Sequence, residues 1–456
     1  MHDLQRTLTL LRQGHARDPL PSLATRLDRL DRLHSALASH AEQLCEAIDA
    51  DFGGRSRQET LLADVVATLD GFRHLRRHLG DWCVPRRVSP HLAFRPSRAT
   101  VFAAPRGVVG IIAPWNYPVN LALAPLGAAL AAGNRALIKP SEITPRTSAA
   151  LGHLLREAFT AEEVALVEGG PDVAEALTRL PLDHLFFTGS TTVGRRVAAA
   201  AAASLVPVTL ELGGKSPAIV CPGAPVATAA ARIASGKVFN GGQTCIAPDY
   251  VLLPEGSSEV FVDAFCDAVA TTGGCSTALV SDRHHARQLA LCGEAESVGA
   301  QVIRAGHDGP GRRLAPRLVL GAPRSCRLWT EEIFGPVLPV ATYRRLDDAL
   351  LEVQSGPRPL AAYVFHASAR EGEDILSRLP CGGGTVNDTL VHFASENLPF
   401  GGTGASGMGA YHGRAGFDAF TQPRSVLAAS TISPARALLS PPYGRAVNVA
   451  ARLLVR

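Results

Sequence analysis

The pattern of apolar positions divides the chain into a helical start and an alternating body. Leucines repeat at helical spacing near the beginning, at Leu23, Leu27, Leu30, Leu33 and Leu37. Residues 59–82 show the same periodicity, which predicts helices over most of the first 82 residues. Prolines at positions 85, 90 and 96 then break the pattern, so residues 84–98 favour an extended arm or hairpin.

From residue 107 onward, short apolar runs alternate with amphipathic stretches. Buried strands are predicted at 108–113, 135–139, 164–168, 184–188 and 208–211. Helices are predicted between them, at 120–132, 147–158, 174–179 and 193–203. This alternation is typical of an α/β protein with a doubly wound parallel sheet. A second α/β region follows, with apolar strands at 216–220, 251–253, 318–320 and 360–365.

The composition is that of a globular protein and excludes several functional classes. Of the 456 residues, 46% are hydrophobic and 19% are charged, which is too apolar for a disordered chain. The formal net charge is only +4 and no basic block occurs, so we expect no nucleic-acid partner. No apolar run reaches the roughly 18 residues of a membrane-spanning helix, so we expect no membrane span.

Cysteine and lysine usage adds two expectations. Nine cysteines are scattered without CxxC pairs, and the polar N-terminus lacks a signal core, which predicts reduced thiols in a cytoplasmic protein without a metal site. Only three of the 45 basic residues are lysines, namely Lys139, Lys215 and Lys237. Because arginine and lysine are not interchangeable at every site, these three positions draw attention to their surroundings.

Two short motifs carry candidate catalytic groups. Cys245 follows Gly241 and Gly242, whose backbone can bring a thiol close to a ligand. Glu211 ends an apolar strand before a glycine turn, where partial burial would raise its pKa and suit it to act as a general base. Each residue also has an ordinary interpretation, as a core cysteine and as a surface glutamate at a strand end.

A strand-to-helix turn and an acidic–aromatic patch are candidate ligand sites. Gly189, Ser190 and Gly194 lie where helix N–H groups and the helix dipole can bind phosphate, although the GxGxxG pattern is absent. Glu332 and Phe334 form the acidic and aromatic patch. Taken alone, each of these segments also has an ordinary interpretation as a plain turn.

Further polar residues follow the first two strands of the alternating sheet. Trp115 and Asn116 come directly after the first strand, and Lys139 and Glu142 come at the end of the second. Ligands of open α/β sheets bind beyond the carboxyl ends of the strands, so Asn116 is well placed to donate a hydrogen bond there.

Together, these motifs resemble those of the NAD(P)-dependent aldehyde dehydrogenase superfamily over roughly residues 100–426. Within it, the segments 51–62, 245–250, 386–390 and 407–413 are most similar to the shorter, class 3-like branch and to coniferyl aldehyde dehydrogenases. The resemblance implies that Cys245 is the nucleophile, Glu211 the general base and Asn116 the side-chain donor of the oxyanion hole. It implies NAD or NADP as cofactor, bound by Trp115, Lys139, Glu142, Gly189, Ser190, Gly194, Glu332 and Phe334.

The resemblance also implies an architecture. A Rossmann-type cofactor domain would comprise residues 1–82 and 103–210, and a second α/β domain, the catalytic one, residues 211–397. An oligomerisation arm would comprise residues 83–102 together with the C-terminal segment 398–430, leaving residues 431–456 as a tail. The chain lacks the N-terminal extension of the tetrameric branches, so the resemblance favours a homodimer.

The expected reaction is oxidation of an aldehyde to the carboxylic acid through a thiohemiacetal and a thioester on Cys245. The likeness to coniferyl aldehyde dehydrogenases, with Trp115, Tyr117 and Phe393 near the motifs, predicts hydrophobic or aromatic aldehydes such as coniferyl aldehyde. These rings are equally compatible with core packing. Two alternatives remain: a coenzyme A-dependent acylating enzyme, which would not need Glu211 to activate water, and a catalytically silent cofactor-binding protein.

Overall fold

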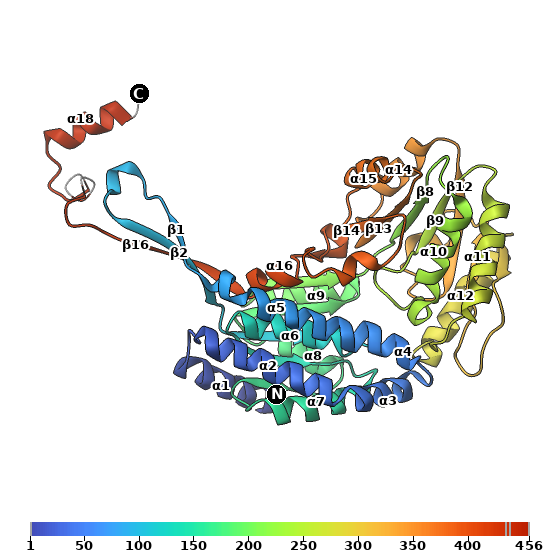
Figure 1. The fold of residues 1–456 in the computed structure, drawn as a ribbon, viewed down its shortest axis with the longest axis horizontal. Coiled ribbons are helices and arrows are strands. Elements are labelled where there is room, and N and C mark those ends of the chain that lie inside the picture. The colour runs from blue at the N-terminus through green and yellow to red at the C-terminus, as the bar shows by residue number, and fades with distance from the viewer. Residues whose placement is uncertain (1, 434–435, 437–438, 455–456) are drawn as a thin grey trace.

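The computed structural model describes residues 2–433, 436 and 439–454 of the chain. Two sheets of mainly parallel strands, covered by helices, form the body of the molecule, and a small antiparallel sheet extends from the body as an arm (Figure 1). The predicted α/β fold class is therefore confirmed. None of the helices that the structure describes is both long and apolar enough to cross a membrane.

The first sheet has the strand order β15-β7-β6-β3-β4-β5. Its parallel strands are β3 (Val108–Ile112), β4 (Arg135–Lys139), β5 (Val164–Leu166), β6 (His184–Gly189) and β7 (Val208–Leu212). They are connected by α6 (Asn120–Ala131), α7 (Pro145–Ala158), α8 (Pro171–Thr178) and α9 (Thr191–Ala202). The order reverses between β3 and β6, which makes the carboxyl ends of these two strands the expected ligand-binding edge.

Helices at the start of the chain cover this sheet, as the leucine spacing predicts. They are α1 (His2–Arg17), α2 (Leu23–Ser39), α3 (Ala41–Phe52), α4 (Arg57–Thr60), a π-helical segment (Leu61–Val66) and α5 (Ala67–Cys83). Leu30, Leu33 and Leu37 are fully buried, whereas Leu23, the first residue of α2, is exposed. The apolar stripe therefore packs α2 onto α5 and α6 from its second turn onward.

The second sheet has the strand order β10-β11-β12-β9-β8-β13-β14. Its strands are β8 (Pro217–Val220), β9 (Tyr250–Pro254), β10 (Gln301–Arg304), β11 (Arg317–Leu320), β12 (Val337–Tyr343), β13 (Ala361–Phe365) and β14 (Gly383–Val386). Its helices are α10 (Val226–Val238), α11 (Ser258–Thr272), α12 (Asp282–Ser297), α13 (Arg327–Thr330), α14 (Leu346–Ser355) and α15 (Ala369–Ser377). The expected domain boundary at residue 211 falls inside β7, so a division between Leu212 and Pro217 fits the two sheets better.

The arm consists of β1 (Arg86–Val88), β2 (Arg98–Pro105) and β16 (Thr421–Ala428), paired in the order β1-β2-β16. Of the segment 398–430, only β16 belongs to the arm. Strand β15 (Gly407–Met408) pairs antiparallel with β7, and α16 (Gly413–Ala419) packs against α5 and α6. Helix α18 (Arg445–Leu454) lies beyond the arm (Figure 1).

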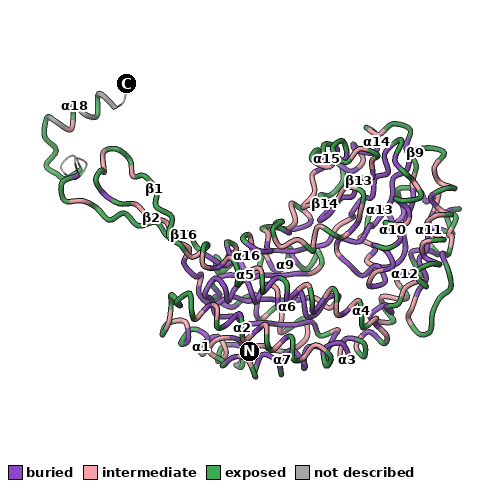
Figure 2. Tube along the Cα trace, viewed as in Figure 1, coloured by how far each residue is buried: buried purple, intermediate pink, exposed green. Residues whose placement is uncertain are grey.

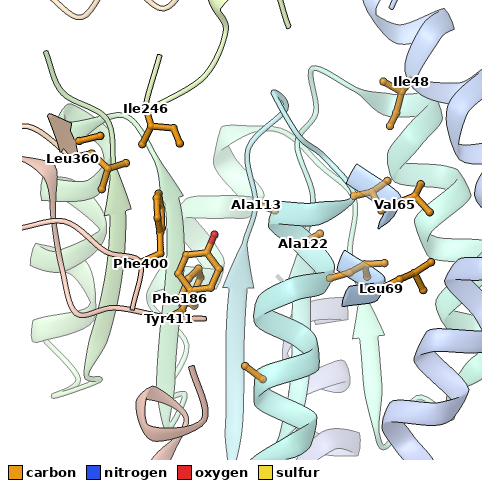
Figure 3. Packing of buried hydrophobic residues seen from close by; sticks show 14 of the residues in the cluster. Ile48, Val65, Leu69, Ala113, Ala122, Phe186, Ile246, Leu360, Phe400 and Tyr411 are labelled. Carbon is orange, nitrogen blue, oxygen red and sulfur yellow. The ribbon is translucent and has the colours of Figure 1, made fainter. Parts of the chain in front are cut away.

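Buried residues concentrate within the two sheets and the helices around them, while the arm is mostly exposed (Figure 2). One continuous apolar cluster contains Val109 and Ile111 of the first sheet together with Ala218 and Ala361 of the second. Part of this cluster, including Phe186, Phe400 and Tyr411, is seen in Figure 3. The two sheets therefore share a core, which holds their strand ends in a fixed relation.

Candidate active site

Two cavities meet at Cys245 and Glu211. The larger has a volume of about 360 Å³ and the smaller about 250 Å³. Both are lined by Leu121, Thr188, Glu211 and Cys245. A molecule in one cavity can therefore react at the thiol with a molecule held in the other.

The turn before Cys245 is built from left-handed backbone. After α10 ends, Asn240, Gly241 and Gly242 have φ angles of 51°, 60° and 72°. A Cβ on Gly242 would lie 2.3 Å from the carbonyl oxygen of Gly335, so only glycine fits there. This turn brings the thiol to the junction of the cavities instead of leaving it in the core.

Burial, together with the nearby carboxylates of Glu332 and Glu211, raises the pKa of the Cys245 thiol to about 12. With this pKa, Cys245 is a neutral thiol at neutral pH. A thiolate is the reactive form, so this cysteine needs a neighbouring base or a positive charge before it can act as a nucleophile.

Glu211 is buried near the end of β7, and neither carboxylate oxygen has a hydrogen-bond partner within the described residues. Burial raises its pKa well above the usual range of a glutamate. When ionised, a carboxylate with a raised pKa is a stronger base than an ordinary glutamate and can accept a proton from water, as a general base does.

Asn116 faces the Cys245 loop. Its side-chain amide nitrogen donates to the main-chain oxygen of Gln243 at 3.1 Å. Its own main-chain oxygen accepts hydrogen bonds from Arg55 and from Asn240, each at 3.0 Å. Asn116 and Cys245 both line the smaller cavity, so the structure brings together the thiol, the carboxyl group and the amide that the sequence singled out.

The smaller cavity lies at the carboxyl ends of β3 and β6. Its other lining residues are Pro114, Trp115, Asn116, Gly189, Ser190, Gly213, His284, Arg287, Glu332 and Phe334. Ser190 is the N-cap of α9, so the N-terminus of this helix opens into the cavity, where a phosphate can bind. The rings of Trp115 and Phe334 meet edge to face, with centroids 5.4 Å apart.

Glu332 places a buried carboxyl group in this cavity. Burial, with the nearby Asp249, raises its pKa to about 8, while the main-chain N–H of Gly214 hydrogen-bonds to it. A Cβ on Gly213 would lie 2.2 Å from its carboxylate oxygens, so glycine at 213 is required for this placement. The groups in this cavity fit a dinucleotide. The N-terminus of α9 suits its phosphates, the carboxyl group of Glu332 suits a ribose hydroxyl, and the aromatic rings suit a flat ring.

Lys139 and Glu142 lie outside the lining of the smaller cavity, at the end of the neighbouring strand β4. The ammonium group of Lys139 donates to Glu142 at 2.5 Å, and the lysine side chain is only 3% exposed. Gly194 lies in the first turn of α9, where a Cβ would meet the Leu212 side chain at 2.4 Å. The absence of a side chain at Gly194 therefore allows α9 to pack closely on β7. Contact between Gly194 and a phosphate stays a prediction.

The larger cavity is predominantly apolar, and apart from Tyr117 and Phe393 the residues that only this cavity contains were not predicted from the sequence. Apart from the shared residues, its lining includes Leu62, Tyr117, Phe239, Ile246, Leu360, Leu390, Val391, Phe393, Phe400 and Tyr411. Tyr117 hydrogen-bonds through its hydroxyl to Thr244, with the two oxygens 2.6 Å apart. Of the three rings noted in the sequence, Tyr117 and Phe393 line this cavity, whereas Trp115 lines the smaller one.

Comparisons with known proteins agree with this geometry. The sequence model of the aldehyde dehydrogenase family matches residues 19–426. The probable coniferyl aldehyde dehydrogenase of Caulobacter vibrioides is 45% identical over 451 residues, which cover 95% of this chain and 93% of the relative. The coniferyl aldehyde dehydrogenase of a Pseudomonas species is 41% identical over 454 residues, covering 97% and 94% of the two chains.

Two solved structures share the fold over nearly the whole chain. The substrate-bound AldH of Staphylococcus aureus superimposes with a TM-score of 0.91 at 35% identity, covering 98% of this chain and 99% of that one. An indole-3-acetaldehyde dehydrogenase in complex with NAD+ superimposes with a TM-score of 0.87 at 28% identity, covering 94% and 89%.

Proposed function

This chain belongs to the aldehyde dehydrogenase family, and we propose that it oxidises hydrophobic, aromatic aldehydes such as coniferyl aldehyde to carboxylic acids with NAD or NADP. The family and the reaction class, aldehyde oxidation by an oxidoreductase, were predicted from the sequence and are confirmed. The observation that carries the proposal is the meeting of an apolar cavity and a polar cavity at Cys245 and Glu211.

The substrate class is supported by the larger cavity and by the names of two relatives. Its wall contains the rings of Tyr117, Phe239, Phe393 and Phe400, which favour contact with a planar apolar substrate. The relatives from Caulobacter vibrioides and from Pseudomonas bear the name coniferyl aldehyde dehydrogenase.

The first proposed step is attack of the Cys245 sulfur on the aldehyde carbon. The carbon–oxygen double bond becomes a single bond, and the oxyanion that forms accepts hydrogen bonds from the Asn116 amide and the Cys245 main-chain N–H. Removing one such donor typically costs about 2.7–4 kcal/mol of transition-state stabilisation. The thiol proton leaves before the attack, and it can pass to solvent or to Glu211, which borders both cavities.

The cofactor is proposed to lie in the smaller cavity. When bound, NAD or NADP would supply the hydride acceptor for the oxidation of the aldehyde. Ser190 and Gly189 would hold the pyrophosphate at the start of α9, Glu332 the adjacent ribose, and Phe334 and Trp115 the ring end. Lys139 and Glu142 would hold the adenine-side ribose at the end of β4.

Glu211 is proposed to complete the reaction. Loss of hydride leaves an acyl group on Cys245, and hydrolysis of that thioester needs a water molecule that loses a proton. Glu211, in its ionised form, would take this proton and pass it to the departing sulfur, so that the carboxylic acid leaves and the thiol is restored. A buried carboxyl beside the thiol favours hydrolysis over transfer to coenzyme A, which needs no activated water.

Initial rates with a panel of aldehydes and with both cofactors test the proposal. We expect coniferyl and cinnamyl aldehydes to exceed propanal in kcat/KM by about two- to twelvefold, because an aromatic contact contributes about 0.5–1.5 kcal/mol. If no aldehyde gave NADH or NADPH, the proposed dehydrogenase activity would be refuted. A preference for short or acidic aldehydes would refute the proposed class of aromatic substrates. An acyl-coenzyme A product on adding coenzyme A would favour the acylating alternative.

A homodimer is proposed from the arm. The arm exposes apolar side chains, among them Leu92, Val426 and Leu427. It projects from the body of the molecule (Figure 2). An exposed strand edge with apolar residues is a liability unless another chain covers it. Light scattering during size-exclusion chromatography should give twice the 47.9 kDa chain mass; a monomer at micromolar concentration would contradict the proposal.

A cytoplasmic location is proposed from the cysteines. All nine lie within the described residues and are free thiols there. Free thiols persist in reducing compartments, where disulfides rarely form. Fractionation of the native cells, followed by detection of the chain in the soluble cytoplasmic fraction, tests this proposal.

A further inference from the structure

A fully buried ion pair lies behind the loop that carries Asn116. Arg55 follows α3, and Asp64 lies in the π-helical segment before α5. A guanidinium nitrogen of Arg55 donates to Asp64 at 3.0 Å, and both side chains are 0% exposed. The pair lines neither of the two cavities, so it has no direct contact with substrate or cofactor.

Arg55 contacts the Asn116 backbone from one side. Its second terminal nitrogen donates to the main-chain oxygen of Asn116 at 3.0 Å. Its guanidinium lies over the rings of Phe52 and Tyr117, 5.0 and 5.1 Å from their centroids. One planar group therefore joins the carboxylate of Asp64, the carbonyl of Asn116 and the ring of the next residue.

Asp64 contacts the same loop farther along the chain. One of its oxygens binds Arg55, and the other accepts hydrogen bonds from the main-chain N–H groups of Val119 and Asn120, each at 3.0 Å. These two residues begin α6, whose N-terminal N–H groups lack partners within the helix. The ion pair thus fixes the backbone both at Asn116 and three residues after it.

We propose that Arg55 and Asp64 are positioning residues that hold Asn116 in place for the oxyanion, an inference that rests on the oxyanion role given to Asn116 above. An oxyanion donor acts only if its nitrogen lies about 2.7–3.1 Å from the developing charge. Arg55 fixes the main chain of Asn116 through the hydrogen bond to its main-chain oxygen, without lining either cavity. The Asn116 amide is then aimed by its backbone when an oxyanion replaces Gln243 as its acceptor.

Lysine cannot replace Arg55 in this arrangement. The guanidinium is a rigid fork that reaches Asp64 and Asn116 with separate nitrogens, whereas an ammonium group is a compact point charge. Arg55→Lys preserves the positive charge opposite Asp64 and removes the fixed second contact. It therefore separates positioning of Asn116 from neutralisation of the buried carboxylate.

A double-mutant cycle in kcat tests the inference. Asn116→Ala alone should lower kcat about 10²- to 10³-fold, as loss of an oxyanion donor does. Arg55→Lys alone should lower kcat by about tenfold or more, with the KM of NAD changed less than about twofold. In the Asn116→Ala background, the same Arg55→Lys change should lower kcat less than about twofold, because the side-chain amide that Arg55 positions is absent.

Arg29→Lys is the matched control. Arg29 on α2 is also buried and paired with a carboxylate, that of Glu163 at 3.1 Å, and it lines neither cavity. This change should leave kcat within about twofold while lowering the thermal midpoint, as a purely structural ion pair would. If Arg55→Lys does not yield folded protein, Asp64→Asn is placed in the same cycle with the same expectation.

The outcomes separate the inference from the proposed function. Equal losses of kcat from Arg55→Lys with and without Asn116 would overturn the positioning role, as would an unchanged kcat in Arg55→Lys. A wild-type protein without aldehyde oxidation, or an Asn116→Ala variant with full kcat, would instead overturn the proposed chemistry on which the inference rests.

Discussion

The two cavities that meet at Cys245 are built in different ways. The smaller one is lined by residues at the ends of strands and the start of a helix, with Asn116, Ser190 and Glu332 among its polar groups. The larger one is lined by apolar side chains from segments spread between residues 62 and 411. Positions in the smaller cavity follow from local motifs, whereas the larger cavity exists only once the chain has folded.

Because the two cavities are built from different residues, we expect substitutions in each cavity to have a separate kinetic effect. Substitutions around the cofactor side should change the kinetics of the cofactor, and those in the larger cavity should change the kinetics of the aldehyde. The residues shared by both cavities, above all Cys245 and Glu211, should affect the reaction with every substrate, and so should the oxyanion donor Asn116.

The largest effect is expected from Cys245→Ser. A neutral hydroxyl is a far weaker nucleophile than a thiolate, so NADH or NADPH formation should fall by at least about 10³-fold with every aldehyde. Steady-state rates measure this loss. Cys266→Ser, at a half-buried thiol on α11, should keep full activity; equal losses in both variants would refute the special role of Cys245.

The next largest effect is expected from Glu211→Gln. An amide cannot accept the proton of water, so hydrolysis of the thioester should slow by about 10²- to 10³-fold while hydride transfer continues. Stopped-flow absorbance should show one burst of NADH per site and slow turnover afterwards. An unchanged steady-state rate would mean that another group activates the water.

A smaller effect, confined to the cofactor side, is expected from Lys139→Arg. Loss of a charge-assisted hydrogen bond is worth roughly 1.5–3 kcal/mol, so the KM of the cofactor should rise about 10- to 150-fold. The KM of the aldehyde should change much less. Arg378→Lys, at an exposed position after α15, is the control; equal, near-zero effects of both changes would remove the special role of Lys139.

On the opposite side, Phe393→Ala should act on the aldehyde alone. Loss of an aromatic contact of about 0.5–1.5 kcal/mol predicts a two- to twelvefold rise in the KM of coniferyl aldehyde. The KM of NAD should stay constant, because Phe393 does not line the smaller cavity. A parallel rise in both constants would show that the two cavities are not independent.

The smallest effect concerns stability and pH. Burial raises the pKa of Glu211 in the folded protein above its value in the unfolded chain, which is about 4.3. The folded protein therefore binds a proton here more tightly, and the resulting contribution to the free energy of unfolding is present in full below about pH 4.3. That stability is lost as pH rises toward the folded pKa. Urea unfolding from pH 4 to 8 should therefore show wild type losing stability relative to Glu211→Gln; parallel curves would contradict the buried, proton-binding state.

Much of the fold could be predicted from the sequence, because buried parallel strands are continuous apolar runs. Strand β4 at Arg135–Lys139 has the predicted bounds. Strand β12 was missed, since Pro339 within it is unusual in a central strand. Strand β14 was missed because Gly383 and Gly384 give it no apolar pattern, and its place in the sheet depends on pairing with β13.

The candidate site divides in the same way. Cys245, Glu211 and Asn116 stand in short motifs at strand ends and turns, and the structure brings them together as expected. The wall of the larger cavity could not be predicted, since Leu62, Phe239 and Leu390 become neighbours only through tertiary packing. Arg55 and Asp64 give only a weak signal, two opposite charges nine residues apart beside an apolar helix.

The most direct test of the central claim is mass spectrometry of Glu211→Gln after mixing with NAD+ and coniferyl aldehyde. We predict one acyl group per chain, attached to the peptide that contains Cys245, at a yield equal to the burst of NADH. An acyl group on another residue, or a burst of NADH with Cys245 unmodified, would contradict covalent catalysis at the junction of the two cavities.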